Sequence, residues 1–379
     1  MSTSSAPDKA RLAALKSFLR TSEKNYGVRG VTLDDPTVAQ VDVIPTGSLS
    51  LDHILGVGGI PRGRITEIYG PTGGGKTTLA LEAAAECQAM GGNIGFVDAE
   101  QALNVSLVEA IGIDKSRFAV FQPDYGEQAA DLAKAMVESD VFDMVIVDSA
   151  AAMTPKAELE AEMEQNFMGL HPRLLSRWMR VIAGPVQKHN VALIVINQVR
   201  TNLNQYGAPD DSTGGKALKF WSSMRIEVRT SASKQLKKGS EVIGTRVKAT
   251  VKKNKFAAPF KMTEYDVIFG KGIDAGLGLF SVALDLGAIN KSGNTYTVVM
   301  LGEDLEEADI RLAVGKDKAV NALRDDEELS QKVTAACQRL MKGKLPREDD
   351  GVAETPEEVL EDESADSGDP DDFFGLGDA

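Results

Sequence analysis

The sequence predicts an α/β protein with a mostly parallel, twisted central sheet, preceded by a helical arm and followed by a small α+β domain. The first indication is a glycine-rich segment between an apolar run and a helical run. The second is the alternation, from about residue 40, of apolar runs of strand length with helical stretches. Near Gly270 this alternation gives way to glycine-rich sequence, and a compact segment with two further helical patterns follows.

The glycine-rich segment predicts a site for a nucleoside triphosphate. Residues 65–69 form an apolar run before it, and an Ala/Leu-rich run follows at 79–89. Glycines let backbone N–H groups surround phosphate oxygens, and the helix N-terminus adds the positive end of its dipole. A lysine and a hydroxyl at this spacing reach the β- and γ-phosphates and Mg²⁺, respectively. The residues expected to bind the nucleotide are Gly70, Pro71, Thr72, Gly73, Gly74, Gly75, Lys76, Thr77 and Thr78.

Composition restricts the class of protein. At 379 residues and 42% hydrophobic residues, the chain is long enough to bury a sizeable core. No apolar run approaches the length of roughly 18 to 20 residues that a membrane span needs. The first residues lack the features of a signal peptide, and Cys87 and Cys337 are too far apart to suggest a disulfide framework. We therefore expect a cytoplasmic protein that does not bind membranes.

The net charge of −14 is concentrated at one end of the chain. Residues 347–379 hold fourteen acids and one base, a net charge of −13, and the remaining 41 bases and 42 acids give −1. Any binding to nucleic acid must therefore come from local basic stripes. We expect this acidic tail, which has few apolar residues before Phe373 and Phe374, to be disordered.

An N-terminal arm, residues 1–39, is predicted to be helical at 8–25, where Leu12, Leu15, Phe18 and Leu19 share one helical face. A lone amphipathic helix is marginal in water, so this face should pack on something. The sequence leaves open whether it packs on its own core or on a neighbouring subunit.

The predicted core spans residues 40–276, and a small domain spans 277–346. Strands are expected at 65–69, 94–98, 118–121, 144–148, 191–197, 224–229 and 246–253, with the last ones added in antiparallel fashion. Helices are expected at 76–90, 126–138, 171–188, 316–324 and 326–342.

Two acids follow strand-like runs in positions suited to phosphate hydrolysis, which needs a carboxylate to orient the metal and a group to position water. Asp148 ends the run 144–148, and Glu100 lies just beyond the run that ends at Asp98. We interpret Asp148 as the acid that serves the metal and Glu100 as a general base. The competing interpretations are a helix cap for Asp148 and a solvated loop acid for Glu100.

Two long stretches without predicted structure follow the core strands, at 157–170 and 199–214. Such stretches in a compact domain are usually functional or disordered. Gln198 precedes the second stretch, and its amide is interpreted either as a contact to a γ-phosphate or as a structural group that closes a core strand. After the first, Arg173, Arg177 and Arg180 share one helical face, either as a solvated charged face or as a surface for a phosphate backbone.

These motifs, in this order, resemble those of the bacterial RecA-type recombinases, as in a phage-borne or divergent member. The resemblance covers about residues 8–340. Beside the glycine-rich segment it rests on 46–52, 98–100, 122–128, 147–158, 167–170, 196–200, 213–220 and 253–260.

The resemblance implies an ATP-dependent homologous recombinase, which is a DNA-dependent ATPase that polymerises as a helical filament on single-stranded DNA. The filament pairs that strand with homologous double-stranded DNA, and ATP with Mg²⁺ lies between neighbouring subunits. In this family pattern Glu100 activates water, Lys76 and Asp148 serve the phosphates and Mg²⁺, and Gln198 couples the γ-phosphate to the following loop. Lys253 and Lys255 would reach the neighbour's ATP, and Phe220 would lie in the interface. The implied DNA-binding residues are Met168, Arg173, Ser176, Arg180, Arg200, Gly214 and Gly215.

The chain departs from the family pattern at three positions near the expected adenine site. Leu107 and Gly276 stand where aromatic residues are usual or frequent, and Asn104 replaces an acid. The tail 347–379 is long and acidic. It would either screen or mimic DNA and dock a partner protein through Phe373 and Phe374, or serve only as a solubilising segment.

Two other functional classes remain compatible with the same core. One is a filament scaffold that binds DNA and regulates other proteins, for which ATP turnover is incidental. The other is a hexameric helicase-like motor. The presence of Glu100 and Lys76 argues against an inactive ATPase. The arm, both loops and the segment 277–345 favour a recombinase.

Overall fold

The computed structural model describes residues 6–28, 30–35, 41–161, 169–200, 211–212, 214–299 and 310–344. Met168 and the acidic tail 347–379 lie outside these ranges, as do most residues of the two stretches predicted to lack structure. Among the described residues no helix combines the length and the apolar character needed to cross a bilayer.

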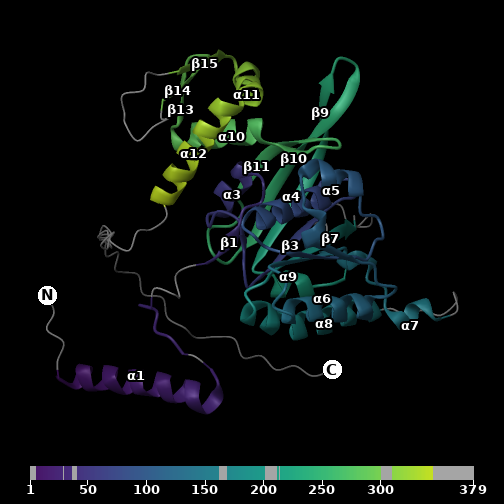
Figure 1. The fold of residues 1–379 in the computed structure, drawn as a ribbon, viewed down its shortest axis with the longest axis vertical. Helices are drawn as coiled ribbons and strands as arrows, with labels where there is room; N and C mark the ends of the chain where they lie inside the picture. The colour runs from purple at the N-terminus through teal and green to yellow at the C-terminus, as the bar shows by residue number, and fades with distance from the viewer. Residues whose placement is uncertain are drawn as a thin grey trace, which may run out of the picture.

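A ten-stranded twisted sheet forms the centre of the fold (Figure 1). Its main path runs in the order β12-β11-β10-β9-β3-β7-β6-β4-β5. The strands on this path and the added β8 are β3 (Ile65–Gly70), β4 (Ile94–Asp98), β5 (Phe118–Phe121), β6 (Met144–Asp148), β7 (Ala192–Arg200), β8 (Asp211–Ser212), β9 (Met224–Lys238), β10 (Glu241–Asn254), β11 (Met262–Ile268) and β12 (Gly272–Asp274). The predicted α/β class and each predicted core strand are confirmed.

Strand direction differs from the prediction at one place. β9 pairs with β3 in parallel, so on the main path only β10, β11 and β12 are added in antiparallel fashion. Off that path, the short β8 pairs antiparallel with β7. β9 and β10 also run well past their predicted ends and form a long hairpin that projects from the core (Figure 1). Pairing between the two strands carries them through residues whose own sequence gives no clear strand pattern.

Helices cover both faces of the sheet because consecutive strand residues point to opposite sides. On β7, Ile194 and Ile196 join the apolar cluster beneath α4 (Lys76–Ala89), whereas Leu193 and Val195 join the cluster beneath α6 (Gly126–Glu138) and α8 (Leu170–Lys188). The strands are therefore apolar on both faces, which is usual for a parallel sheet. Shorter elements complete this part: α3 (Leu49–Leu55), α5 (Val105–Ile111), α7 (Lys156–Leu159), α9 (Ala217–Trp221), two 3₁₀ turns (Lys115–Arg117 and Ala150–Ala152), and β1 (Val43–Ile44) paired with β2 (Ile60–Pro61).

The C-terminal region has an apolar cluster of its own. It contains α10 (Ala275–Leu286), an antiparallel sheet of β13 (Ile289–Ser292), β14 (Thr295–Val298) and β15 (Ile310–Val314), then α11 (Lys316–Asp325) and α12 (Glu327–Lys344). Helix α10 begins at Ala275, so the boundary expected between residues 276 and 277 falls within its first turn.

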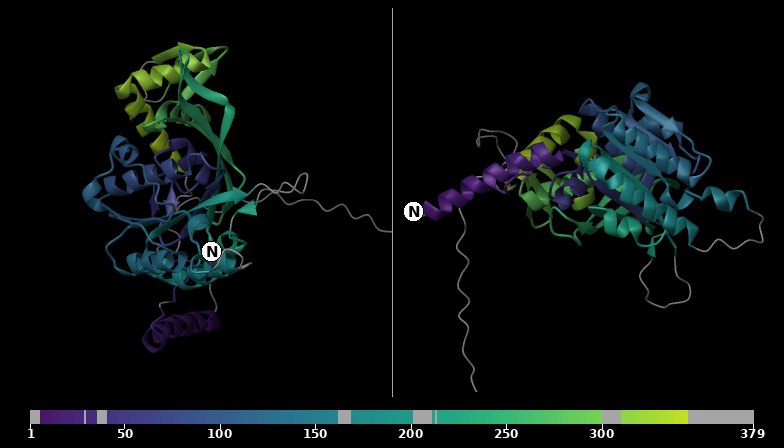
Figure 2. Two further views of the ribbon diagram at one scale, coloured as in Figure 1. Left: turned by 90° about the vertical axis from the view of Figure 1, so that its right-hand side faces the viewer. Right: turned by 90° about the horizontal axis from the view of Figure 1, so that it is seen from below.

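The N-terminal helix α1 (Ala6–Tyr26) lies apart from the rest of the chain (Figures 1 and 2). On its predicted apolar face, Leu12, Leu15 and Phe18 are 51%, 44% and 65% exposed. Packing of this helix on its own core, one of the two possibilities left by the sequence, is therefore not observed.

Candidate active site

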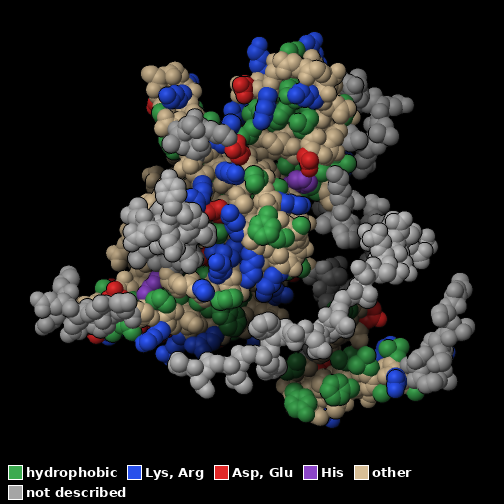
Figure 3. Space-filling view, turned by 180° about the vertical axis from the view of Figure 1, so that it is seen from behind, with side chains coloured by type: hydrophobic (Ala, Val, Ile, Leu, Met, Phe, Trp, Pro, Cys, Tyr) green, Lys and Arg blue, Asp and Glu red, His purple; other side chains and the backbone are tan. Residues whose placement is uncertain are grey.

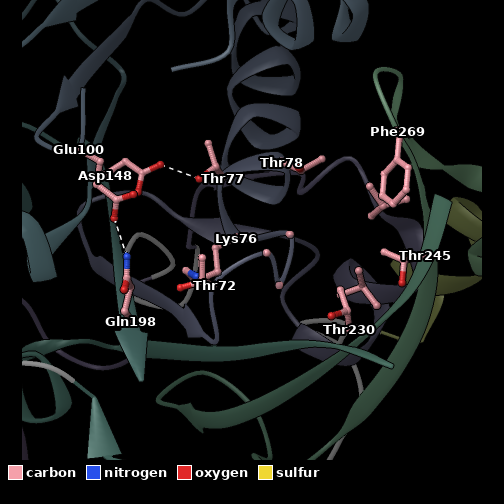
Figure 4. Close-up of a pocket in the computed structure, with 15 residues that line it drawn as sticks. Thr72, Lys76, Thr77, Thr78, Glu100, Asp148, Gln198, Thr230, Thr245 and Phe269 are labelled. Atoms are coloured by element: carbon pink, nitrogen blue, oxygen red, sulfur yellow. Dashed lines mark hydrogen bonds between the residues drawn. The ribbon is translucent and has the colours of Figure 1, made fainter. Parts of the chain in front are cut away.

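One pocket is lined by residues 72–78 of the predicted nucleotide-binding segment, by the predicted base Glu100 and by Asp148, the acid predicted to serve the metal (Figure 4). Gly70 and Pro71 do not line it. The pocket opens where the glycine-rich segment joins β3 to α4, beside the carboxyl ends of β6 and β7. The opposite wall comes from β9, β10 and the end of β11. The lining residues are Thr72, Gly73, Gly74, Gly75, Lys76, Thr77, Thr78, Glu100, Asp148, Gln198, Thr230, Thr245, Val247, Val267 and Phe269.

The glycines are required by the close course of this segment. A Cβ on Gly70 would lie 2.0 Å from the carbonyl oxygen of Val228, and Gly75 has a φ of +85° immediately before α4. The Lys76 ammonium donates a hydrogen bond to the carbonyl of Pro71 over 2.8 Å. Burial lowers the pKa of Lys76, whereas Asp148 and Glu100 oppose that shift. The pocket thus holds a cation that is poorly solvated and has one carbonyl partner.

Thr77 and Asp148 form the pair that fits a divalent cation. The Thr77 hydroxyl donates to Asp148 Oδ2 over 2.6 Å (Figure 4). Burial raises the pKa of Asp148 to about 6, in spite of this hydrogen bond. A hydroxyl and a carboxylate are hard oxygen ligands of the kind that Mg²⁺ prefers. Within the described residues no group of three or more His, Cys, Asp or Glu side chains could hold a metal ion.

Glu100 is held from two sides at one carboxylate oxygen. Gln198 Nε2 donates to Glu100 Oε1 over 2.9 Å, and the Ser149 hydroxyl donates to the same oxygen. The Glu100 backbone N–H donates to the carbonyl of Asp148 over 3.2 Å. The second oxygen of the Glu100 carboxylate takes no part in either side-chain bond, so it is the one suited to accept a proton.

Asp98, the other strand-end acid, is buried and organises the loop that presents Glu100. Its carboxylate accepts hydrogen bonds from the backbone N–H groups of Ala102 and Leu103 and from the side chain of Gln122, over 3.0 to 3.2 Å. The two backbone bonds tie the end of β4 to the loop that follows Glu100, and the Gln122 bond ties it to the segment after β5.

Lys253, Lys255 and Phe220 lie outside this pocket. Lys253 Nζ donates to the carbonyls of Lys219 and Phe220 over 2.8 and 3.0 Å. Burial lowers the pKa of Lys253, and the nearby Lys255 lowers it further. The Phe220 ring is 69% exposed on α9.

The predicted DNA-binding residues fall in two regions. Arg173, Ser176 and Arg180 lie on α8, and Gly214 and Gly215 pack against the first turns of that helix. The side chain of Arg200 is outside the described part of the structure. Figure 3 shows Lys and Arg side chains gathered across the middle of the face seen from behind. The near-neutral body of the chain therefore has a local basic surface.

Both stretches that were predicted to lack secondary structure contain short helices or strands. Residues Val199 and Arg200 extend β7 and pair with Ser212 and Asp211 of β8, so the interval 199–214 starts and ends in a short antiparallel ladder. Helix α7 occupies the start of the interval 157–170. A two-residue strand is invisible in sequence because its partner, rather than its own pattern, stabilises it.

The pocket contains an aromatic residue that the sequence analysis did not identify. Phe269, 58% exposed, follows β11 and lines the pocket together with Val267. Gly276 instead lies beneath Arg324, whose Cγ would be 2.5 Å from a Cβ at that position. The departure from the family pattern at Gly276 stays a prediction. Leu107 packs against the core, and Asn104 caps α5 by accepting from the Leu107 N–H over 3.2 Å.

Comparison with known proteins identifies the family. Residues 13–274 match the model of the RecA N-terminal domain. The chain is 45% identical to Protein RecA of Thermus aquaticus over 324 residues, which is 85% of this chain and 92% of that protein. It is 42% identical to Protein RecA of Wolinella succinogenes over 333 residues (87% and 92%) and 43% identical to that of Chloroherpeton thalassium over 335 residues (88% and 91%). The chain belongs to the RecA family.

Proposed function

We propose that this protein is an ATP-dependent homologous recombinase that acts in DNA recombination and repair. It forms a helical filament on single-stranded DNA, pairs that strand with a homologous duplex and promotes strand exchange. The observation that carries the proposal is the bond from Gln198 to Glu100. It joins the candidate catalytic carboxylate to the residue that precedes the interval 199–214, and so connects the hydrolytic site with a candidate DNA-binding segment.

In the hydrolytic step, Glu100 accepts a proton from the water whose oxygen bonds to the γ-phosphorus, while the bond from that phosphorus to the β–γ bridging oxygen breaks and ADP leaves. Lys76 exchanges its bond with the Pro71 carbonyl for the β- and γ-phosphate oxygens, and the backbone N–H groups of residues 70–78 surround the phosphates. Thr77 and Asp148 would hold Mg²⁺, which would neutralise charge on the phosphate oxygens. Gln198 turns from Glu100 to the γ-phosphate, which frees the base and moves the end of β7.

Neighbouring subunits complete the nucleotide site. Lys253 and Lys255 are outside the pocket of their own chain, and we assign them to the ATP of the adjacent subunit. The exposed Phe220 ring and the exposed apolar face of α1 supply contact area. A head-to-tail contact of this kind that does not close produces an open helix, which matches a filament.

DNA binding is assigned to α8 and to the two intervals that flank it in the fold. Met168, Arg173, Ser176, Arg180 and Arg200 supply side chains, and Gly214 and Gly215 supply backbone N–H groups. Phosphate contacts are independent of sequence, so the bases stay available to test a duplex by Watson–Crick pairing.

For the acidic tail 347–379 we propose that it competes with DNA for basic surfaces and that Phe373 and Phe374 dock a partner protein. The chain truncated after residue 346 should bind single-stranded DNA more tightly than the full chain, and this difference should shrink as salt rises, because salt weakens the competition by the tail. Identical affinity and salt response for both chains would leave the tail as a solubilising segment.

The test of the main function is a strand-exchange assay with homologous and non-homologous duplexes, with ATP present or absent. We expect exchange only with homology and ATP, and none for Lys76→Ala. Filaments that protect DNA but exchange no strands would support the scaffold class. ATP-driven unwinding of a duplex without exchange would support the helicase class.

A further inference from the structure

His171 lies where three segments of the site meet. It is in the first turn of α8, and its Nε2 is 2.8 Å from the carbonyl oxygen of Ala150. Its Cε1 would be 3.1 Å from a Cβ on Gly214. The ring therefore touches the turn that follows Asp148 and the residue that ends the interval 199–214, while it is itself part of the helix that carries the DNA-binding arginines.

The turn contacted by His171 holds Glu100 in place. Ala152 N–H donates to the Ser149 carbonyl over 3.0 Å, which closes the 3₁₀ turn that includes Ala150. From the same turn the Ser149 hydroxyl donates to Glu100 Oε1. A shift of the Ala150 carbonyl is thus passed within one turn to the carboxylate.

A second route reaches Glu100 from the other side. Gln198 donates to the carboxylate, and the next residue, Val199, pairs with Ser212 two positions before Gly214. Gly214 has a φ of +87° and no room for a side chain, since a Cβ there would lie 2.2 Å from Leu175 Cδ1. The contacts form a closed ring: Glu100, Gln198, the β7–β8 ladder, Gly214, His171, the turn at Ala150, Ser149 and Glu100 again.

We infer that His171 is a positioning residue that transmits DNA binding at α8 and at Gly214 to Glu100, along a route separate from Gln198. The inference rests on the proposed function, because it assumes that these elements contact DNA. Nε2 donates to the Ala150 carbonyl, which requires a proton on that nitrogen. DNA that binds at the first turn of α8 and displaces it also moves the His171 Nε2 donor. The turn at Ala150 follows, and Ser149 then sets the orientation of the Glu100 carboxylate.

Two substitutions separate this role from general support. His171→Ala removes the donor, whereas His171→Gln keeps an N–H donor on a side chain of similar reach. We expect His171→Ala to lower the DNA-stimulated kcat for ATP roughly five-fold, the value of one hydrogen bond of about 1 kcal/mol. The DNA-free rate should change less than two-fold, and single-stranded DNA should bind with unchanged affinity. His171→Gln should restore stimulation.

His189→Ala is the matched control. This histidine follows α8 at its other end, where Nδ1 pairs with Asp140 over 2.6 Å, far from the ring of contacts. Its loss should leave stimulation unchanged. Thermal unfolding of each variant shows whether it is folded. If His171→Ala does not fold, His171→Asn, which is too short to reach Ala150, takes its place against His171→Gln.

The route through Ser149 gives a second measurement. Because both residues act in series, Ser149→Ala with His171→Ala should reduce stimulation no further than the more damaging single change. The inference would be overturned if His171→Ala kept full stimulation by DNA or lost the DNA-free rate to the same extent. It would also be overturned if His171→Gln failed to restore stimulation, or if the losses in the double variant were additive. A parent protein with no DNA-stimulated hydrolysis would instead overturn the proposed function.

Discussion

Gln198 Nε2 donates a 2.9 Å hydrogen bond to Glu100 Oε1, across 98 positions of the chain. The bond connects the carboxyl end of β7 with the loop after β4. It places the proposed general base under the control of a residue that adjoins a candidate DNA-binding interval.

Glu100→Gln should lower ATP hydrolysis at least about 100-fold, because the amide cannot accept the proton of the attacking water. ATP should still bind, so the variant should remain on single-stranded DNA longer than the parent. Phosphate release and DNA dissociation after dilution measure the two effects. Glu138→Gln, at a surface acid paired with Lys134, is the control and should behave as the parent. Hydrolysis within three-fold of the parent would remove Glu100 as the base.

Asp148→Asn should stabilise the fold at pH 8 while it abolishes Mg²⁺-dependent nucleotide binding. Burial raises the pKa of Asp148 from 3.8 to about 6, so between these values the folded chain binds more protons than the unfolded chain. The ionised carboxylate therefore destabilises the fold above pH 6, by about 3 kcal/mol at most. That cost declines as the pH falls from 6 toward 3.8 and is lost fully only below 3.8. Urea unfolding should show the full advantage for the variant at pH 8 and about half of it at pH 5. An equal difference at both pH values would contradict the assignment.

Phe269→Ala should weaken nucleotide binding about ten-fold, since the ring supplies apolar contact area at the pocket wall. Titration with a fluorescent ATP analogue, followed by competition with ATP, measures the change. Phe260→Ala is a suitable comparison because that ring is 70% exposed and does not line the pocket. If both variants bind ATP as the parent does, the adenine of ATP is bound by other residues.

Arg324→Ala should loosen the attachment of the C-terminal region to the core. Arg324 Nη2 and Nε bond to Asp266 and Asp274 over 2.7 and 2.6 Å, and Asp266, which is fully buried, also pairs with Arg246. Loss of one partner leaves a buried carboxylate half-compensated, which should cost about 2 kcal/mol in the free energy of unfolding. Denaturant unfolding gives that value, and limited proteolysis should show faster cleavage around residues 270–276. Lys332→Ala, at a surface pair with Glu328, should have no measurable effect on either.

The core could be predicted because its signals are local. The glycine-rich segment, the strand-length apolar runs and the acids at their ends lie close together in sequence, and parallel strands bring those ends to one edge of the sheet. Lys76, Thr77, Asp148 and Glu100 were therefore expected together, and the pocket contains all four. The proximity of Thr77 and Asp148 was expected, since both residues were assigned to one metal ion.

Other features had no local signal. Phe269 enters the pocket because β11 is added to the far side of β10, and neither the residue nor its neighbours form a recognisable motif. Residues Asp211 and Ser212 become a strand only because β7 extends to meet them. The parallel direction of β9 likewise depends on its pairing with β3.

The amino-acid sequence alone determined the α/β class, the phosphate-binding segment, the strand-end acids and the resemblance to RecA-type recombinases, because periodicity and short motifs record local conformation. The tertiary structure alone decided that Ser149 and Gln198 share one oxygen of Glu100, that His171 touches both Ala150 and Gly214, and that Arg324 covers Gly276. These contacts join residues 21 to 98 positions apart along the chain in the measured hydrogen bonds. They exist only because strand order and helix packing bring distant segments within hydrogen-bonding distance.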